Sequence, residues 1–462
     1  MRGWWIPVLA SLAAGYVVHD GNTCTLYPES LKNDGKAVDD APSIHDAFDR
    51  CGTDGKVIFT DHVFNINTVL NTTNLVNCDV SVQGELRFST DIPYWLSHSY
   101  SVVFQDQSTA WLFGGENVTL RGEGGWYNGN GQAWYTQNRN RNNQPGRPIS
   151  ITFYKSRNLL VDGLRVIQPQ FWATFVWQSK NVSITNFYVN ATSNDEWSTV
   201  NTDGYDSWNS EDLRVENAVV SNTDDCIAVK GNTTNLLVRN VTCHRGFGMA
   251  IGSLGQYITT PDYVENIVFE DVRCHDCMEA AFIKTWQGVP EDNSSNGDGG
   301  GGGSGHVKNV SFRNFELTNV ALPIQISQCI YTENGQNCNT SKMAIEDISW
   351  SNIKGTTRYN IGASIYCSDV HPCPGITFEG VDLVSVNSTL GLPMSDTTLQ
   401  DEVYQCTNII GQKDSGIPCN RAAPSNYGQV VTSNVKDTGT EKSEPARAES
   451  NIPKQERLAW HV

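Results

Sequence analysis

The sequence predicts an all-β fold, a single-stranded right-handed parallel β-helix with a capping helix at its N-terminal end. Short segments alternate apolar and polar residues and are rich in Val, Ile and Phe, which indicates strands. These segments recur from about residue 79 to 390, and between residues 158 and 266 their spacing alternates between 23 and 31 residues. Such recurrence without helical patterns between the segments is typical of a solenoid. A propeller is the alternative, but its blades need a regular period of about 40–50 residues.

The N-terminus reads MRGWWIPVLASLAAGYVV, with one Arg before an apolar run from Trp4 to about Val18. This shape is typical of a secretory leader and is too short for a permanent membrane helix. We therefore assign residues 1–18 to a signal peptide, with a buried strand as the alternative. The next element is a helix over residues 39–51 (DDAPSIHDAFDRC), which has a helix-starting pattern. We expect it to cover the open N-terminal end of the core.

One domain is expected over residues 24–420, because the strand-like units follow one another without a break. Asn, Asp and Gly at the ends of the units are expected to form the corners of the coils. The units start at residues 79, 117, 158, 181, 212, 235, 266, 309, 347 and 375. Gly299 to Gly303 lie in an acidic loop, which is either flexible or beside a binding groove. Residues 421–462 are polar and charged and predict a disordered tail.

Thirteen cysteines in an exported chain indicate several disulfides and at least one unpaired thiol. The expected pairs are Cys226/Cys243, Cys329/Cys338, Cys367/Cys373, Cys406/Cys419 and Cys24/Cys51. Cys274 and Cys277 resemble a metal half-site, but with no second C-x-x-C we expect a disulfide or buried thiols. Ten N-x-S/T sequons agree with export as candidate glycosylation sites: Asn71, Asn117, Asn181, Asn190, Asn232, Asn240, Asn293, Asn309, Asn339 and Asn387.

The net charge of −18 argues against a nucleic-acid partner, because phosphate neutralisation needs a basic face. An acidic polymer can still bind to a local cluster of Lys or Arg. Beyond the leader, no run of residues is long and apolar enough for a membrane helix. We expect a secreted monomer with no membrane partner.

Three aspartates are the candidate catalytic residues. Asp203 in NTDGYDSW and Asp224 in NTDDCIAVK are 21 residues apart, about one coil, so Asp203 should stack one coil from Asp224 and Asp225. Crowded carboxylates raise the pKa of at least one member, which yields the protonated acid and ionised base that a glycosidase needs. The alternatives are a ladder of corner residues and, ranked lower, a calcium site.

The stretch CHRGFGMAIGSLGQY, residues 243–257, comes close to a dinucleotide fingerprint. It lies between strand units and opens no helix, so we interpret its glycines as residues that allow tight turns at the floor of a groove.

These motifs together resemble glycoside hydrolase family 28, the polygalacturonases and related pectin hydrolases. NTDG at 201–204, DDC at 224–226, the Gly-rich stretch at 246–255 and FIK at 282–284 occur in the family order, and SLGQY is similar to secreted fungal exo-acting members. The resemblance extends over residues 24–420. It implies a pectin-lyase-like parallel β-helix, which agrees with the repeat pattern, and it implies no metal or organic cofactor.

Carried over by position, the resemblance implies that Asp224 is the general acid and that Asp203 and Asp225 activate water for inversion. It implies that Lys284 meets the carboxylate of a bound galacturonate. Tyr331 is the candidate for the family's groove tyrosine.

Two aromatic residues depart from the family pattern. Phe247 replaces the histidine of G-H-G, and Phe282 replaces the arginine of R-I-K. An apolar ring in place of a guanidinium weakens the case for polygalacturonate and suits the methyl group of rhamnose. His244 and Arg245 lie close by in sequence and are candidates to compensate; for His244, a solvated residue next to a disulfide cysteine is the alternative.

The resemblance therefore implies a secreted, glycosylated, exo-acting hydrolase that removes terminal galacturonic acid from polygalacturonate. One alternative is an exo-hydrolase of rhamnogalacturonan that releases galacturonate or rhamnose. Another is a catalytically weak pectin-binding wall protein, against which the intact aspartate set argues.

Overall fold

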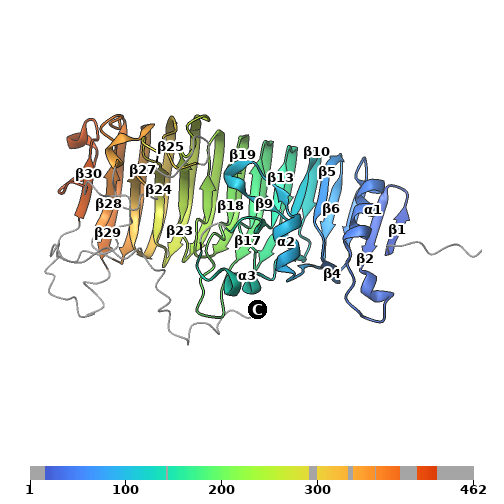
Figure 1. Cartoon of the computed structure of the whole chain (residues 1–462). Helices are drawn as coiled ribbons and strands as arrows, with labels where there is room; N and C mark the ends of the chain where they lie inside the picture. Colours follow the sequence, from blue (N-terminus) through green and yellow to red (C-terminus); the bar gives the residue numbers. More distant parts are fainter. Residues whose placement is uncertain are drawn as a thin grey trace, which may run out of the picture.

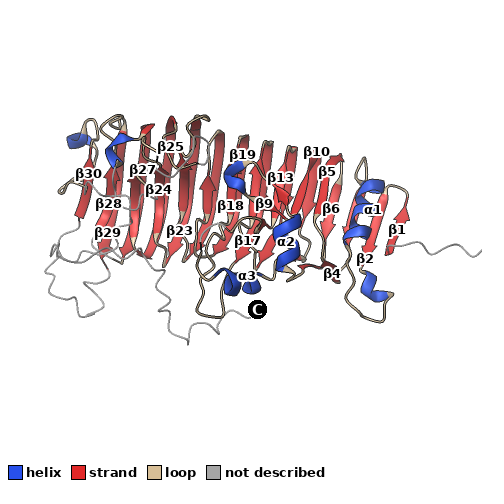
Figure 2. Cartoon of the chain, in the orientation of Figure 1, coloured by secondary structure: helices blue, strands red, loops and turns tan. Residues whose placement is uncertain are grey.

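The computed structural model describes residues 16–141, 144–290, 299–330, 337–358, 361–385 and 403–423. Its strands stack side by side along one axis, from the blue N-terminal end to the orange-red C-terminal end of Figure 1. Nearly all pairings between neighbouring strands are parallel. Figure 2 shows that strands form nearly the whole stack, with only a few helices around it. The predicted parallel β-helix is confirmed.

Most coils contribute one short strand and one long, bent strand. The short strands are β13 (Ile151–Tyr154), β16 (Thr174–Trp177), β18 (Tyr205–Trp208), β20 (Ile227–Val229), β22 (Met249–Leu254), β24 (Glu279–Thr285), β26 (Leu322–Ser327), β28 (Ile361–Tyr366) and β30 (Val403–Thr407). The long strands are β17 (Lys180–Asn190), β19 (Ser210–Ser221), β21 (Thr233–His244), β23 (Asp262–His275), β25 (Ser304–Val320), β27 (Lys342–Thr357) and β29 (Ile376–Ser385).

The N-terminal coils are less regular. Their strands are β1 (Tyr16–Asp20), β2 (Thr23–Tyr27), β3 (Lys56–Phe59), β4 (Val63–Ile66), β5 (Leu70–Val76), β6 (Asp79–Val82), β7 (Glu85–Phe88), β10 (Trp111–Arg121), β11 (Trp126–Asn128), β14 (Arg157–Asp162) and β15 (Arg165–Ile167). A separate small sheet contains β8 (Tyr100–Ser101), β9 (Ser108–Thr109) and β12 (Pro148–Ile149). The α-helices are α1 (Ala41–Cys51), α2 (Ile92–His98) and α3 (Gly131–Asn138).

Asn and Asp corners, spaced five residues apart, bend the long strands from β17 to β27. In β21 these corners are Asn235 and Asn240, with φ of 57° and 53°. Asn and Asp tolerate this left-handed conformation better than other side chains. The corner side chains also connect the coils, because Asn240 Nδ2 donates to Asn217 Oδ1 at 2.8 Å and Asn235 Nδ2 donates to Asp212 Oδ1 at 2.9 Å. The predicted strand units and their polar corners are therefore confirmed.

The predicted capping helix is α1, which lies across the N-terminal end of the stack (Figure 1). Its Ile44, Ala47 and Phe48 are buried in the core. A disulfide between Cys24 and Cys51 joins the helix to β2. The helix thus covers the open end of the apolar interior.

All five expected disulfides are present: Cys24–Cys51, Cys226–Cys243, Cys329–Cys338, Cys367–Cys373 and Cys406–Cys419. In the described part of the chain the free cysteines are Cys78, Cys274 and Cys277, all buried. Cys274 and Cys277 are therefore buried thiols, one of the two outcomes expected for them.

The two ends of the chain are described only in part. The last residues of the expected leader belong to β1, which pairs antiparallel with β2. Residues 1–15 and 424–462 lie outside the described residues, so the leader and the tail remain predictions. Among the described residues, no helix has the length and apolar character needed to cross a membrane.

The short strands position the site on their outer face. Alternate residues point inward to the core, such as Ile227, Met249 and Ile283. The residues between them form an outer row, in which Asp206 aligns with Ala228, then Ala250, then Phe282 and Gln325. Residues one coil apart in this row are separated by about 4.8 Å, the spacing of paired strands.

Candidate active site

The turns that precede β18 and β20 bring the three predicted aspartates together. Asn222 lies between the two turns, and its Nδ2 donates to the carbonyl oxygens of Thr202 and Asp225, each at 2.9 Å. Asp203, Asp224 and Asp225 each place a carboxylate oxygen within 4.8 Å of the others. The stacking that the 21-residue spacing predicts is therefore present.

Two buried lysines lie among these carboxylates. Lys284 Nζ is 2.8 Å from Asp225 Oδ2. Lys230 Nζ is 3.7 Å from Asp203 Oδ2 and 4.0 Å from Asp225 Oδ2. Asp224 differs from the other two, because it is half-buried and no ion pair to it is found among the described residues. Its Oδ2 instead accepts the backbone N–H of Asn201 at 3.0 Å.

Burial shifts the pKa values of the cluster. Burial raises the pKa of Asp203 well above its usual value, Asp224 and Asp206 raise it further, and Lys230 opposes the shift. Burial, followed by the charge of Asp225, also raises the pKa of Asp224. The cluster therefore retains protons at pH values where exposed carboxylates are ionised. Such a group can supply both an acid and a base to one reaction.

The residues that the sequence reasoning missed are Asp206, Lys230, Glu279 and Arg147, all buried beside the cluster. Burial raises the pKa of Asp206 to about 7 and that of Glu279 to about 8, and it lowers the pKa of Arg147 to about 10. The period-two alternation of β18 could have placed Asp206 on the outer face. Arg147 precedes β12, far away in sequence, and no local pattern indicates it.

The cluster also has the close carboxylate oxygens that a cation site would need. Lys230 and Lys284 already supply positive charge at this place. No cofactor is implied by this arrangement.

An apolar patch adjoins the carboxylates on the outer face. It consists of Ala228, Ala250 and Phe282, with half-buried Phe247 packed against them. The Phe247 N–H donates to the Asp224 carbonyl at 2.8 Å, which fixes the Phe247 backbone beside that of the acid. Lys284 Nζ lies 4.9 Å from the centroid of the Phe282 ring. Both replacement phenylalanines are thus part of the site.

The glycines beside Phe247 allow close packing of the Gly-rich turn. A Cβ at Gly246 would lie 2.3 Å from Asn222 Oδ1 and 2.6 Å from the Asp224 carbonyl oxygen. Gly248 has φ of 73°, a conformation that side chains disfavour. The turn serves packing beside the aspartates, as the sequence indicated.

The remaining expected binding residues have other partners or lie outside the description. The His244 ring stacks on His275 with centroids 5.1 Å apart, and burial lowers the His244 pKa. Arg245 Nη2 donates to Ser221 Oγ. The described contacts therefore do not connect either residue to the carboxylates. Tyr331 lies outside the described residues.

The sequons fall into two groups. Asn117, Asn181, Asn232, Asn240 and Asn309 donate through Nδ2 to a neighbouring corner Asn. Asn71, Asn190 and Asn339 lie outside these ladders, while Asn293 and Asn387 lie outside the described residues. The regular corner pattern therefore accounts for much of the sequon density, and glycosylation remains a prediction.

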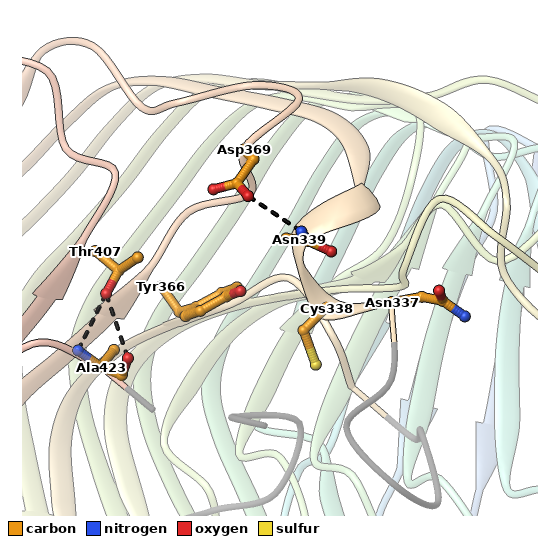
Figure 3. Close-up of a pocket in the computed structure, with 7 residues that line it drawn as sticks. All are labelled: Asn337, Cys338, Asn339, Tyr366, Asp369, Thr407 and Ala423. Atoms are coloured by element: carbon orange, nitrogen blue, oxygen red, sulfur yellow. Dashed lines mark hydrogen bonds between the residues drawn. The ribbon is translucent and has the colours of Figure 1, made fainter. Parts of the chain in front are cut away.

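A hollow of about 350 Å³ lies toward the C-terminal end of the stack, away from the carboxylate cluster (Figure 3). Its lining is polar and comprises Asn337, Cys338, Asn339, Tyr366, Asp369, Thr407 and Ala423. It holds none of the clustered carboxylates.

Residues 62–406 match glycosyl hydrolases family 28. The chain is 37% identical to "Alpha-L-rhamnosidase rgxB" of Aspergillus niger, over 81% of this chain and 85% of the relative. It is 34% identical to "Exopolygalacturonase" of Cochliobolus carbonum, over 83% of this chain and 86% of the relative. Among solved structures, endo-xylogalacturonan hydrolase from Aspergillus tubingensis superposes with a TM-score of 0.72 at 26% identity, covering 87% of this chain and 99% of that one. This extent of similarity establishes that the chain belongs to glycosyl hydrolases family 28 and is a glycoside hydrolase.

Proposed function

We propose that this protein is a secreted, monomeric, exo-acting hydrolase of pectic polysaccharides. The main support for this proposal is the carboxylate cluster, in which Asp224 differs from Asp203 and Asp225 in exposure and in ion pairing. Half-buried Asp224 forms no ion pair within 4 Å with a described residue and is placed to protonate the leaving oxygen. Lys230 lies 3.7 Å from Asp203 and opposes the burial that raises the pKa of Asp203, and Lys284 lies 2.8 Å from Asp225. We assign water activation to these two carboxylates.

Exo action is supported by the filled outer face of β16. Phe175 and Trp177 occupy this face, and Phe104 covers it from the segment before β9. The Phe104 ring lies 4.7 Å from that of Trp208, and Gln105 Nε2 donates to Gln256 Oε1 at 2.6 Å. A sugar chain bound at Asp224 therefore meets packed aromatic side chains in the coils toward the N-terminal end of the stack. A blocked groove favours cleavage at a chain end.

Terminal galacturonic acid of polygalacturonate is the first candidate for the released sugar. Its support is the similarity to the relative named exopolygalacturonase. Lys284 lies beside the apolar patch, with its Nζ 4.9 Å from the Phe282 ring centroid, although this Nζ pairs with Asp225 in this structure.

Terminal rhamnose of rhamnogalacturonan is the second candidate, and the apolar patch favours it. Phe247, Phe282 and the two alanines offer an uncharged surface where the family pattern has an imidazole and a guanidinium. Rhamnose carries a methyl group where galacturonate carries a carboxylate. The relative named alpha-L-rhamnosidase supports the same candidate.

The test is incubation of purified protein with oligogalacturonate, rhamnogalacturonan oligomers and a simple α-L-rhamnoside. Monosaccharide as the sole early product supports exo action, and its identity selects between the two sugars. Early release of mixed oligomers overturns exo action. Binding without release from all three substrates supports a pectin-binding protein instead.

Stereochemistry is tested in the same reaction, by proton NMR of the first anomer formed. We expect inversion, as the family resemblance implies. The carboxylate oxygens lie within 4.8 Å of one another, which is nearer to the roughly 5–5.5 Å of retaining pairs than to the roughly 6.5–9.5 Å of inverting pairs. The anomer formed is therefore a sharp test, and the retained anomer would overturn the proposed division of roles among Asp203, Asp224 and Asp225.

A further inference from the structure

Lys230 has no assigned role, yet it lies at the centre of the carboxylate cluster. It directly follows β20, and its backbone N–H donates to the Ser207 carbonyl at 2.9 Å, so the strand pairing fixes its place on the outer face. Its side chain is 6% exposed and its Nζ lies 5.0 Å from the centroid of the Trp172 ring. A buried ammonium group needs compensating negative charge.

Three carboxylates supply that charge. Lys230 Nζ is 3.1 Å from Asp206 Oδ1, 3.7 Å from Asp203 Oδ2 and 4.0 Å from Asp225 Oδ2. Asp206 is fully buried and points outward from β18, one coil from Ala228. It is therefore the nearest anchor of the ammonium group, and it has no assigned role in the reaction.

The two aspartates that Lys230 approaches besides Asp206 are the proposed water-activating residues. The proposed acid, Asp224, forms no such pair among the described residues. The position of one ammonium group thus matches the proposed division between acid and bases.

We propose that Lys230 is a positioning residue, anchored by Asp206, that holds Asp203 and Asp225 in place as the water-binding pair and opposes proton uptake by Asp203. The inference rests on the proposed function. Lys230 acts through the carboxylates and does not touch substrate, because its side chain is buried beneath Trp172 and the aspartates.

Several other charges share this environment. Lys284 faces Asp225 from β24, and Glu279 of the same strand lies near Asp224 and Asp225. Arg147 adds positive charge near Asp203 and Asp224. Without Lys230, buried Asp203 and Asp206 would keep no lysine partner within 4 Å among the described residues, and proton uptake would relieve their repulsion.

The test is the pH profile of kcat/KM for Lys230→Met. An opposite charge at this distance lowers a carboxyl pKa by about 1–3 units. Removal of Lys230 should therefore shift the acidic limb, the low-pH side of the kcat/KM profile, to higher pH by about 1–3 pH units. We expect kcat to fall and KM to stay within about twofold, since Lys230 does not contact substrate. Lys155→Met is the matched control, because exposed Lys155 also lies over an aromatic ring, that of Tyr154, outside the cluster.

A second variant, Asp206→Asn, keeps the inference falsifiable if Lys230→Met fails to fold. Replacing the Asp206 carboxyl should move the acidic limb to lower pH, because Asp206 competes with Asp203 for the Lys230 ammonium group. Shifts in opposite directions support the inference, and an unmoved limb in a folded variant overturns it. A wild-type protein that is inactive on all three substrates overturns the proposed function and this inference together. An active wild type with unmoved variants overturns only the inference.

Discussion

Asp224 is exposed enough to meet substrate, whereas Asp203 and Asp225 are 2% and 0% exposed. This difference in access, added to the missing ion pair, distinguishes the acid from the bases. We expect Asp224→Asn to lower kcat by about 10²–10⁴-fold, the usual contribution of a general acid. The measurement is steady-state kinetics on the substrate that the wild type cleaves.

Asp262→Asn is the control for this variant. Asp262 is also a buried aspartate with a raised pKa, but it lies outside the cluster and accepts the Gly255 N–H. Its replacement should leave kcat nearly unchanged. A near-normal rate for Asp224→Asn, with the fold intact, would remove Asp224 as the acid.

Phe282 is the residue that bears on the sugar. Phe282→Arg restores a guanidinium beside Lys284, where a charged hydrogen bond to a carboxylate contributes about 1.5–3 kcal/mol. The ratio of kcat/KM for galacturonoside over rhamnoside should rise by roughly tenfold to a hundredfold. Phe282→Leu, which stays apolar, is the control and should not raise the ratio. An unchanged ratio in Phe282→Arg would place sugar selection elsewhere.

The Asn ladders, in which corner side chains of neighbouring coils hydrogen-bond to one another, stabilise the stacking of the long strands. Asn240→Asp keeps a residue that tolerates positive φ but removes the Nδ2 donor to Asn217. We expect the free energy of unfolding to fall by about 1 kcal/mol. Asn71→Asp also removes a sequon, but Asn71 is exposed and accepts from Thr73, so it should cost little. Denaturant unfolding of both variants, made without glycans, measures the difference; equal losses would contradict a ladder contribution.

The long strands were predicted well from the sequence, because their corners depend on a local pattern of Asn and Asp residues. An Asn or Asp five residues from another, such as Asn235 and Asn240, bends the chain wherever it occurs. The short strands and α3 were not foreseen individually. Their residues are buried on both faces, as in β22, so no regular alternation of apolar and polar residues marks which face forms the groove.

The site was predictable where it depends on coil spacing and unpredictable where it depends on distant packing. The stack of Asp203 on Asp224 and Asp225 follows from one coil length. The pairing of Lys284 with Asp225 does not, because sequence gives no side-chain direction across 59 residues. Arg147 reaches the cluster through the packing of the segment after α3 on the coil.

Several buried carboxyl groups of the protein have raised pKa values, and we expect these groups to determine how its stability depends on pH. Burial raises the pKa of Asp40 and Asp262 to about 6, of Asp206 to about 7 and of Glu279 to about 8. Each group binds more protons in the folded than in the unfolded state between its unfolded and folded pKa values. The stability from these groups is fully present below about pH 4 and is lost as the pH rises to about 8. His244, whose pKa is lowered, acts in the opposite direction within this pH range. The carboxyls of Glu85, Glu123, Asp195 and Glu270, whose pKa values are also lowered, act in that direction only below about pH 5.

The unfolding temperature should therefore decrease between pH 5 and pH 8, and calorimetry at one-unit steps measures it. Glu279→Gln identifies a source of the slope, because the neutral amide mimics the protonated acid. This variant should unfold at a higher temperature than the wild type at pH 8 and at nearly the same temperature at pH 5. Glu316→Gln, at an exposed surface position, is the control and should leave the slope unchanged. A stability that rises toward pH 8 would show that the buried carboxyls are ionised in the folded protein, at the expense of the proposed proton on Asp224 as well.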